Sequence, residues 1–280
     1  MTENLNRKVV DGFDHEWPSF DQTDVPLDEP EQAFDRHFSV FPLDGLNGEE
    51  IGFDLGCGSG RWAQFIARKV RTLHCIDPAS AALRVAQAKL EDADNCQFHL
   101  AEVNEIPFTE NSINFGYSLG ILHHVPDTAA GITTCVQKRK IGAPFLIYLY
   151  YAFHNRPSWF RALWSLSDLG RRVIAQAPKT LKYIICQRLA GLVYWPLART
   201  ARFAEQLALR VATFALSHYR TNRFYTMRSD ALDRFGTRLK QRSNREEIAT
   251  MLRDAGLERV EFSSSEPFWC ALGYQANPAK

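Results

Sequence analysis

The sequence predicts an α/β fold built on a doubly wound, mostly parallel sheet. From residue 51 onward, short apolar segments alternate with helical segments of about ten residues. A glycine-rich turn joins the first apolar segment to the helix that follows it, and the same alternation returns at the end of the chain. Strands that alternate with short helices are typical of parallel βαβ units.

Each element follows from its own residues. Beta-branched and apolar runs predict five strands in the first part of the chain, at 51–55, 72–77, 96–101, 112–122 and 144–153. Apolar residues at helical spacing predict helices over 61–70 and 78–90. Near the end, 244–257 predicts an amphipathic helix closed by Gly256, and 258–265 and 268–275 predict two strands separated by Glu266 and Pro267.

These patterns divide the chain into four parts. Residues 1–50 predict an N-terminal helical cap, 51–153 the core, 154–242 a helical insertion after the fifth strand, and 243–280 the helix and strand pair that complete the core. The whole chain has a net charge of +1, but the insertion holds 17 Lys and Arg against 4 Asp and Glu, a balance of +13. The insertion therefore differs chemically from its flanks.

Composition excludes several classes of protein. A hydrophobic content of 45% with 23% charged residues is ordinary for a globular chain. The six cysteines are scattered without a CxxC pair and no HExxH occurs, so neither a disulfide framework nor a metal site is expected. No 20-residue stretch lacks charge and no secretory signal precedes the first helix, which favours a cytoplasmic protein without a spanning helix.

The glycine-rich turn is the strongest local signal for a ligand. Gly56, Gly58 and Gly60 follow a strand and open a helix, where backbone N–H groups can approach a ligand closely. The dinucleotide form GxGxxG needs a small residue at position 61, which is arginine here. Asp54, two residues before the first glycine, would repel a diphosphate and attract a cationic amine. The turn therefore favours a nucleoside that carries an amino acid.

Four motifs resemble those of the class I S-adenosylmethionine-dependent methyltransferases, in particular a type 11-like methyltransferase domain. They are DLGCGSG at 54–60, Asp77 at the end of the second strand, HLAEVNEIPF at 99–108 and YSLGILHHVPD at 117–127. The resemblance covers 50–152 and 244–274 but not the insertion. It implies a Rossmann-like seven-stranded sheet with the order 3-2-1-4-5-7-6 and S-adenosyl-L-methionine as cofactor.

The resemblance also implies roles for single residues. Asp77 lies 23 positions after Asp54 and would bind the ribose, a role that is compatible with its also capping the helix that follows. Glu102 and Val103 would face the adenine, unless Glu102 only faces solvent, and Leu119 would lie near the sulfonium. The implied cofactor-binding residues are Asp54, Gly56, Gly58, Gly60, Asp77, Glu102, Val103 and Leu119.

Catalysis by such a domain needs alignment, exclusion of water and, for an O–H or N–H acceptor, a base. His123 and His124 follow the fourth strand at the edge where open α/β sheets bind ligands, and either could be that base. The alternative is that the pair only packs and shapes the site. Asp127 is expected to cap a helix from 128, and Trp17 and Tyr117 could either cage the sulfonium or pack in the core.

Two positions depart from the family pattern. Arg139 and Ile141 occupy unusual places in the turn before the fifth strand, which predicts a distorted turn, and Asn114 stands where an aspartate is common.

The insertion leaves the carboxyl edge of the sheet and is expected to act as a lid that selects the substrate. Its charge favours an anionic acceptor that is small or linked to a lipid or glycan, with O-methylation favoured, and it could contact a membrane surface peripherally. Candidate substrate-binding residues are Tyr219, Arg220, Tyr225, Arg228 and Arg234. Alternatively, Asp230 and Asp233 satisfy those arginines internally.

The sequence is also compatible with two other functions, an RNA methyltransferase and an inactive scaffold. An RNA methyltransferase would need an open basic stripe, but no RNA-binding module is present, so nucleic acid is disfavoured as a partner. An inactive cofactor-binding scaffold at a membrane surface is the other alternative. The sequence does not determine the oligomeric state.

Overall fold

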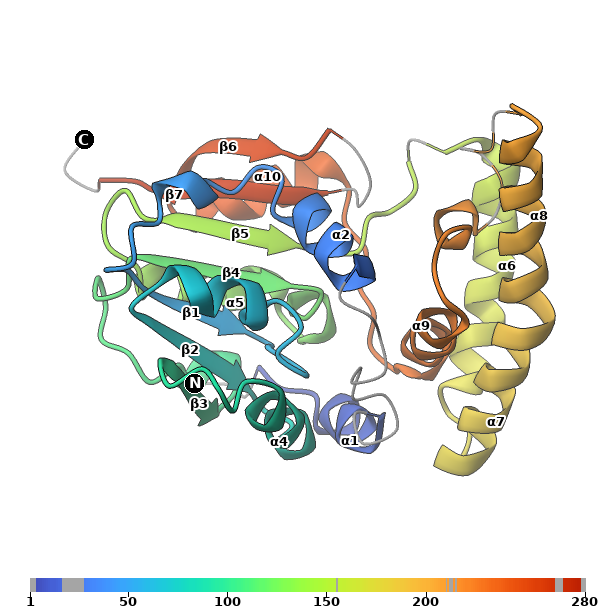
Figure 1. Ribbon diagram of the computed structural model, residues 1–280, viewed down its shortest axis with the longest axis horizontal. Helices are drawn as coiled ribbons and strands as arrows, with labels where there is room; N and C mark the ends of the chain where they lie inside the picture. Colours follow the sequence, from blue (N-terminus) through green and yellow to red (C-terminus); the bar gives the residue numbers. More distant parts are fainter. Residues whose placement is uncertain are drawn as a thin grey trace. The chain divides into compact units, whose positions relative to one another are not determined.

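The computed structural model describes residues 4–16, 28–154, 156–209, 211, 214, 216–264 and 269–277. The chain divides into two compact units (Figure 1). Unit 1 comprises Met1–Ala152 and Leu239–Lys280, and unit 2 comprises Phe153–Arg238. Unit 2 occupies nearly the same residues as the basic insertion expected from the sequence.

Unit 1 is built on a seven-stranded sheet with the order β3-β2-β1-β4-β5-β7-β6, which confirms the predicted topology. The first five strands pair in parallel, and β7 runs antiparallel to both β5 and β6. The strands are β1 (Ile51–Leu55), β2 (Thr72–Asp77), β3 (Cys96–Leu100), β4 (Phe115–Leu119), β5 (Pro144–Tyr148), β6 (Leu257–Phe262) and β7 (Cys270–Gln275).

The fifth strand is shorter than the sequence pattern predicts. It ends at Tyr148, whose carbonyl accepts a bond from Gly120 N just beyond β4. Past that point Tyr150 and Ala152 exchange backbone hydrogen bonds with Ser243, at 2.9 and 3.0 Å. The chain remains extended and apolar there, but its partner is the returning segment that follows unit 2 and not the sheet.

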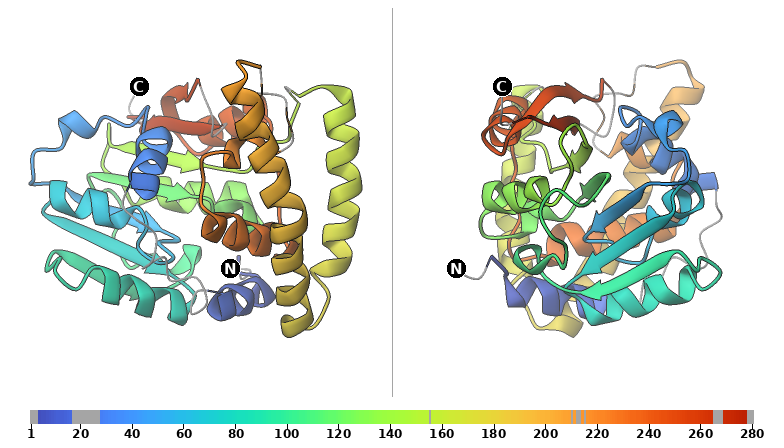
Figure 2. Two further views of the ribbon diagram at one scale, coloured as in Figure 1. Left: turned by 45° about the vertical axis from the view of Figure 1, so that its right-hand side comes forward. Right: turned by 90° about the vertical axis from the view of Figure 1, so that its left-hand side faces the viewer.

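Helices cover both faces of the sheet, as the right-hand view of Figure 2 shows. One apolar cluster lies under α2, α3 and α4 and includes Phe38, Trp62 and Tyr117. The other lies under α5 and α10 and includes Phe53 and Phe145. These helices are α2 (Asp28–His37), α3 (Ala63–Ile66), α4 (Ser80–Lys89), α5 (Thr128–Gln137) and α10 (Arg245–Asp254). Both faces are buried, as a parallel sheet requires.

The N-terminal segment, which contains Asn4 and the helix α1 (Arg7–Glu16), is tied to the carboxyl edge of the sheet at two places. Asn4 exchanges two hydrogen bonds of 2.8 Å with the backbone of Asp127, at the start of α5. Asp14 accepts a 2.7 Å bond from Ala81 N in the first turn of α4. The N-terminal segment therefore bridges two loops that follow strands.

Unit 2 is helical, and within its described residues no strand occurs. Its elements are α6 (Ser158–Ile174), α7 (Lys179–Leu189), a π-helical turn (Ala190–Tyr194), α8 (Trp195–Gln206) and α9 (Phe224–Gly236). The buried small residues Ala190, Ala198 and Ala231 allow these helices to pack closely. Across the part of the chain that the structure describes, no helix is both long and apolar enough to cross a membrane.

Candidate functional site

The glycine turn after β1 has a backbone that only glycine adopts readily. Gly56, Gly58 and Gly60 have φ values of +75°, +53° and +72°. A Cβ on Gly56 would lie 2.5 Å from the side chain of Ile121, so space as well as conformation demands glycine there. Gly56 N donates a 2.8 Å bond to the carbonyl of Ile76, which ties the turn to β2.

Asp54 is a fully buried carboxylate beside this turn. Its side chain is 0% exposed, and among the described residues neither carboxylate oxygen has a hydrogen-bond partner. Loss of water raises the pKa of Asp54 well above its ordinary value, which the hydroxyl of Tyr117 offsets in part and the charge of Asp77 increases. A buried carboxyl of this kind is stabilised by a cationic or donor group.

Asp77 joins the glycine turn to the next loop. Its Oδ2 accepts a 3.0 Å bond from Gly58 N, and its Oδ1 accepts a 2.8 Å bond from Ala79 N, just before α4. Burial raises the pKa of Asp77 to about 6, although both backbone bonds favour the charged form. The carboxylate thus caps the turn before the helix, and each oxygen retains a further lone pair. Ribose binding by Asp77 remains a prediction.

The other predicted cofactor residues lie along the same edge. Glu102 is half-buried at the start of the turn after β3, whereas the side chain of Val103 is buried in the core. Leu119 ends β4 opposite Tyr148. Tyr117 is fully buried and packs edge-on against Phe38 at 5.2 Å between ring centroids, so its ring belongs to the core. Trp17 lies outside the described residues.

The histidine pair follows β4 directly in a single 3-10 turn, Leu122–His124. Nδ1 of His124 lies 2.7 Å from the carbonyl oxygen of Leu239. Because a carbonyl can only accept, Nδ1 carries the proton, and in the neutral ring the lone pair lies on Nε2. The ring of Phe13 from α1 meets His124 edge-on at 5.4 Å.

His123 lies in an aromatic and cationic cluster formed with the returning segment. Its ring stacks on Tyr150 at 3.9 Å, and in the described part of the chain neither ring nitrogen has a hydrogen-bond partner. Lys240 Nζ and the Arg242 guanidinium lie 4.3 and 5.4 Å from the centre of the Tyr150 ring. Burial, the neighbouring His124 and these cations hold the pKa of His123 well below its ordinary value, so the ring is neutral at pH 7.

The predicted substrate-binding residues are bonded within unit 2. Tyr219 donates a 2.8 Å bond to Asp230, and Arg220 forms a 2.9 Å ion pair with Glu205. Arg228 donates to Gln187 and to Tyr183, and Arg234 donates to Ser167 at 3.1 Å. Tyr225 is half-buried on α9. These arginines bond within unit 2 to Glu205, Gln187, Tyr183 and Ser167, so both their pairing with Asp230 and Asp233 and their contact with a substrate remain predictions.

Several residues of the site are not marked by any motif in the sequence. Asn4 and Asp14 lie in an acidic segment whose target loops are far along the chain, so no local signal marks them. A weak sequence signal exists for Tyr150, Lys240 and Arg242. They lie close to the two ends of the insertion, where the chain leaves and rejoins the edge of the sheet. Among the described residues, no group of three or more His, Cys, Asp or Glu is arranged to hold a metal ion.

Comparison with known proteins agrees with this geometry. Residues 53–139 match a family model described as a methyltransferase domain. Ubiquinone biosynthesis O-methyltransferase from Paracidovorax citrulli is 29% identical over 145 residues, which cover 51% of this chain and 58% of that protein. The protein of the same name from Alkalilimnicola ehrlichii is 30% identical over 152 residues, covering 50% and 60%. The chain thus spans about three fifths of the length of these relatives.

Solved structures share the fold over nearly the whole chain. A protein from Methanococcus maripaludis, assigned as an S-adenosyl-L-methionine-dependent methyltransferase, has a TM-score of 0.52 at 12% identity, covering 99% of this chain and 98% of that one. The methyltransferase chain of a Haloferax volcanii complex with the activator Trm112 has a TM-score of 0.51 at 14% identity, covering 95% and 98%. Residues 53–139 are thus similar to a methyltransferase domain, and unit 1 has the fold of the class I methyltransferases.

Proposed function

We propose that this protein is an S-adenosyl-L-methionine-dependent methyltransferase that methylates an oxygen of a small or lipid-linked, acidic acceptor. The observation that carries the proposal is Asp54, a fully buried carboxyl beside a turn of three glycines with positive φ, which has no cationic partner and no hydrogen bond of ordinary geometry among the described residues. The O-methyltransferases that the chain resembles support oxygen as the acceptor atom. The cytoplasmic location predicted above belongs to the same proposal.

The residues present fit this cofactor better than a dinucleotide. Asp54 and the backbone of Gly56, Gly58 and Gly60 would hold the amino-acid end, because a cationic amine relieves the buried negative charge. Arg61, where the dinucleotide turn needs a small residue, argues against a diphosphate. Asp77, Glu102, Val103 and Leu119 would line the nucleoside and sulfonium parts. When bound, S-adenosyl-L-methionine supplies the electrophilic methyl group.

The proton of the acceptor hydroxyl goes to His124. The bond from its Nδ1 to Leu239 leaves the lone pair of the neutral ring on Nε2, where that proton would be held. Lys240 and Arg242 add positive charge on the same side of the sheet edge and favour an acceptor oxygen that carries negative charge. His123, neutral and stacked on Tyr150, positions this cluster and is the second candidate base.

Calorimetry with S-adenosylhomocysteine tests the cofactor site. We expect the wild type to bind this product and not a nicotinamide dinucleotide. Asp77→Asn should weaken the affinity about ten-fold or more, because a ribose hydroxyl loses a charged acceptor. The matched control is Asp127→Asn, which alters a carboxylate that also caps a helix, through its bond to Ala130 N, and which the proposal leaves outside the cofactor site. Equal affinities in the two variants would refute the ribose assignment.

Turnover separates catalysis from binding. With labelled S-adenosyl-L-methionine and a panel of small hydroxy compounds that carry a carboxylate, His124→Asn should bind S-adenosylhomocysteine normally and lose methyl transfer, because asparagine can still donate to Leu239 but has no basic nitrogen. Transfer at the wild-type rate in this variant would exclude His124 as the base. Transfer by the wild type to none of these compounds would exclude a small hydroxyl acceptor with a carboxylate.

A further inference from the structure

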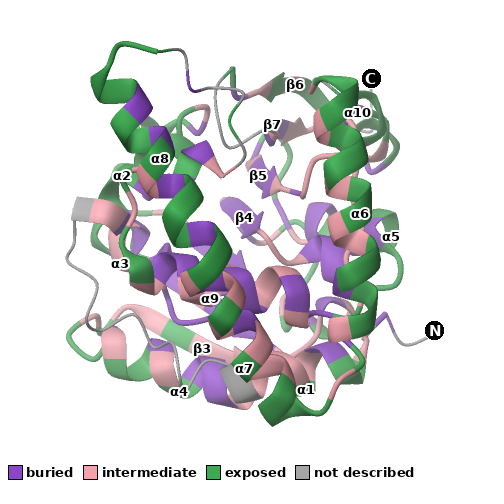
Figure 3. Ribbon diagram, turned by 90° about the vertical axis from the view of Figure 1, so that its right-hand side faces the viewer, coloured by how far each residue is buried: buried purple, intermediate pink, exposed green. Residues whose placement is uncertain are grey.

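The helix α6 in unit 2 presents its apolar residues outward. Five large apolar side chains along it are between 51% and 69% exposed, namely Trp159, Leu163, Leu166, Leu169 and Val173. At 100° per residue they occupy about 120° of the helix circumference, one continuous stripe about 20 Å long. Figure 3 shows α6 exposed along most of its length. Soluble helices ordinarily turn such a stripe toward their own core.

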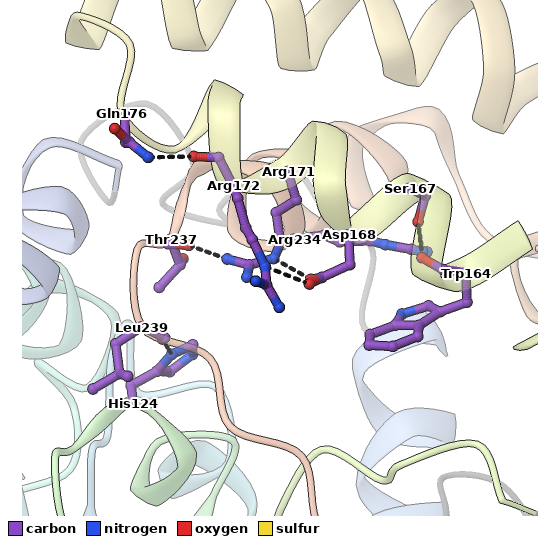
Figure 4. A network of polar contacts seen from close by, with 10 residues as sticks. All are labelled: His124, Trp164, Ser167, Asp168, Arg171, Arg172, Gln176, Arg234, Thr237 and Leu239. Carbon is purple, nitrogen blue, oxygen red and sulfur yellow. Dashed lines mark hydrogen bonds and ion pairs between the residues drawn. The ribbon is translucent and has the colours of Figure 1, made fainter. Parts of the chain in front are cut away.

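The opposite face of α6 is polar and is bonded within unit 2 (Figure 4). Asp168 accepts bonds from Arg171 at 2.6 Å and from Arg172 at 3.0 Å. The buried Arg171 also donates to the carbonyl of Thr237 at 3.0 Å. Burial would raise the pKa of Asp168, but the two arginines outweigh it and lower that pKa, so the carboxylate is charged at pH 7. These bonds determine which way the helix faces and hold the apolar stripe outward.

The flanks of the stripe are basic. Arg161 and Arg172 are both exposed and lie between Asp168 and the stripe, about 60–80° around the helix from Leu169. The second long helical segment, α7 through α8, also exposes large apolar side chains among cations: Leu181, Ile184, Leu192, Trp195 and Phe203 alternate with Arg188 and Arg202. Apolar residues and arginines mixed on exposed helices are typical of segments that lie in a lipid interface.

The acids of the insertion neutralise only part of this charge, and that part includes Arg172 through its 3.0 Å ion pair with Asp168. Residues 154–242 contain only four acidic side chains against 17 basic ones. Each of the four accepts a bond inside unit 2: Asp168 from Arg171, Glu205 from Arg220, Asp230 from Tyr219 and Asp233 from Thr237. The remaining positive charge is complementary to anionic headgroups and repels a second copy of the same surface.

We infer that the α6 stripe, defined as Trp159, Leu163, Leu166, Leu169 and Val173, is a docking surface for the headgroup region of an anionic lipid bilayer. The apolar side chains enter the interface while the flanking arginines contact lipid phosphates, so attachment is peripheral and reversible. This inference concerns where the protein is held and does not depend on which acceptor is methylated.

Cosedimentation of the full chain with vesicles tests the inference. The protein should pellet with vesicles of equal parts phosphatidylcholine and phosphatidylglycerol at low salt, less at high salt, and little with phosphatidylcholine alone. The double variant Leu166→Glu with Leu169→Glu should bind the anionic vesicles about ten-fold less or weaker still. The matched control, Leu100→Glu with Ile141→Glu, adds the same charge at exposed apolar residues of unit 1 and should bind like the wild type.

Charge and competing partners are distinguished in the same experiment. Arg161→Gln with Arg172→Gln should reduce binding to anionic vesicles and leave the weak binding to neutral ones unchanged. Wild-type protein that pellets with neither vesicle, or a glutamate variant that binds as the wild type does, would overturn the inference. A dimer that dissociates in the Leu166→Glu variant would assign the stripe to a second copy instead. Loss of folding in that variant but not in the control would assign it to the protein's own core. Binding of S-adenosylhomocysteine, measured in parallel, reports separately on the cofactor site.

Discussion

Replacing Asp54 with asparagine should stabilise the cofactor-free protein and weaken its hold on the cofactor. The buried carboxyl has no partner among the described residues, and its pKa is raised well above 3.8. The folded state therefore binds the proton more tightly than the unfolded state. The stability that this carboxyl contributes is complete below pH 3.8 and is lost as the pH rises toward the folded pKa.

The free-energy cost of ionising the buried Asp54 carboxyl has an upper limit at pH 7. Each pKa unit is worth 1.36 kcal/mol, so about 3 units between 3.8 and 7 allow a cost of about 4 kcal/mol at most. An asparagine amide buried at the same place costs about 1–3 kcal/mol when it lacks partners. The variant should therefore be more stable than the wild type at pH 7, by at most about 1–3 kcal/mol in the free energy of unfolding, and the difference should shrink toward pH 4.

The affinity of the Asp54→Asn variant for S-adenosylhomocysteine should fall, although its stability rises. A charge-assisted bond between the carboxylate and a cationic amine is worth about 1.5–3 kcal/mol, which predicts a loss of about 10- to 100-fold in affinity for S-adenosylhomocysteine. Urea unfolding at several pH values and calorimetry measure the two effects. A variant that is less stable than the wild type at pH 7, or that binds S-adenosylhomocysteine with unchanged affinity, would contradict the proposal that Asp54 binds a cationic ligand.

Two further substitutions test the backbone and the core. Gly56→Ala should lower the free energy of unfolding by about 2–5 kcal/mol, because the backbone is left-handed and the new Cβ collides with Ile121. Gly120→Ala, with φ +84° and no atom within 4 Å of the new Cβ, should lower it by about 1–2 kcal/mol. Similar urea midpoints for the two variants would contradict the role of the collision. Arg139 is fully buried with Nε and one terminal nitrogen lacking partners among the described residues, and burial lowers its pKa to about 9. Arg139→Met should leave the free energy of unfolding unchanged or raise it by about 1–4 kcal/mol at pH 7, despite losing the 2.7 Å bond to the Ala143 carbonyl. Because Arg139 loses its proton more readily in the folded state than in the unfolded state, the wild type should gain stability above about pH 9 and the variant should not. A large decrease in the free energy of unfolding of Arg139→Met at pH 7 would show that the charge is needed.

The sequence determined the local features of the domain because these depend on neighbouring residues. Strand periodicity, the glycine turn at Gly56 and the acid that ends β2 are set within a few positions, and the strand order followed from the resemblance that these motifs carry. The structure also explains the two positions that depart from the family pattern. The Asn114 side chain accepts a 3.1 Å bond from Ile51 N beside β1, and Arg139 turns inward over the ring of Phe145.

Only the tertiary structure decided what meets across long sequence separations. The bond between His124 and Leu239 spans 115 positions and determines which ring nitrogen can accept a proton, and Asn4 binds the start of α5 across 123 positions. The sequence of α6 shows an apolar and a polar side but not which of them packs inward. That orientation depends on partners such as Thr237 and Arg234, which are brought to α6 by the folding of the chain and not by any pattern within the helix.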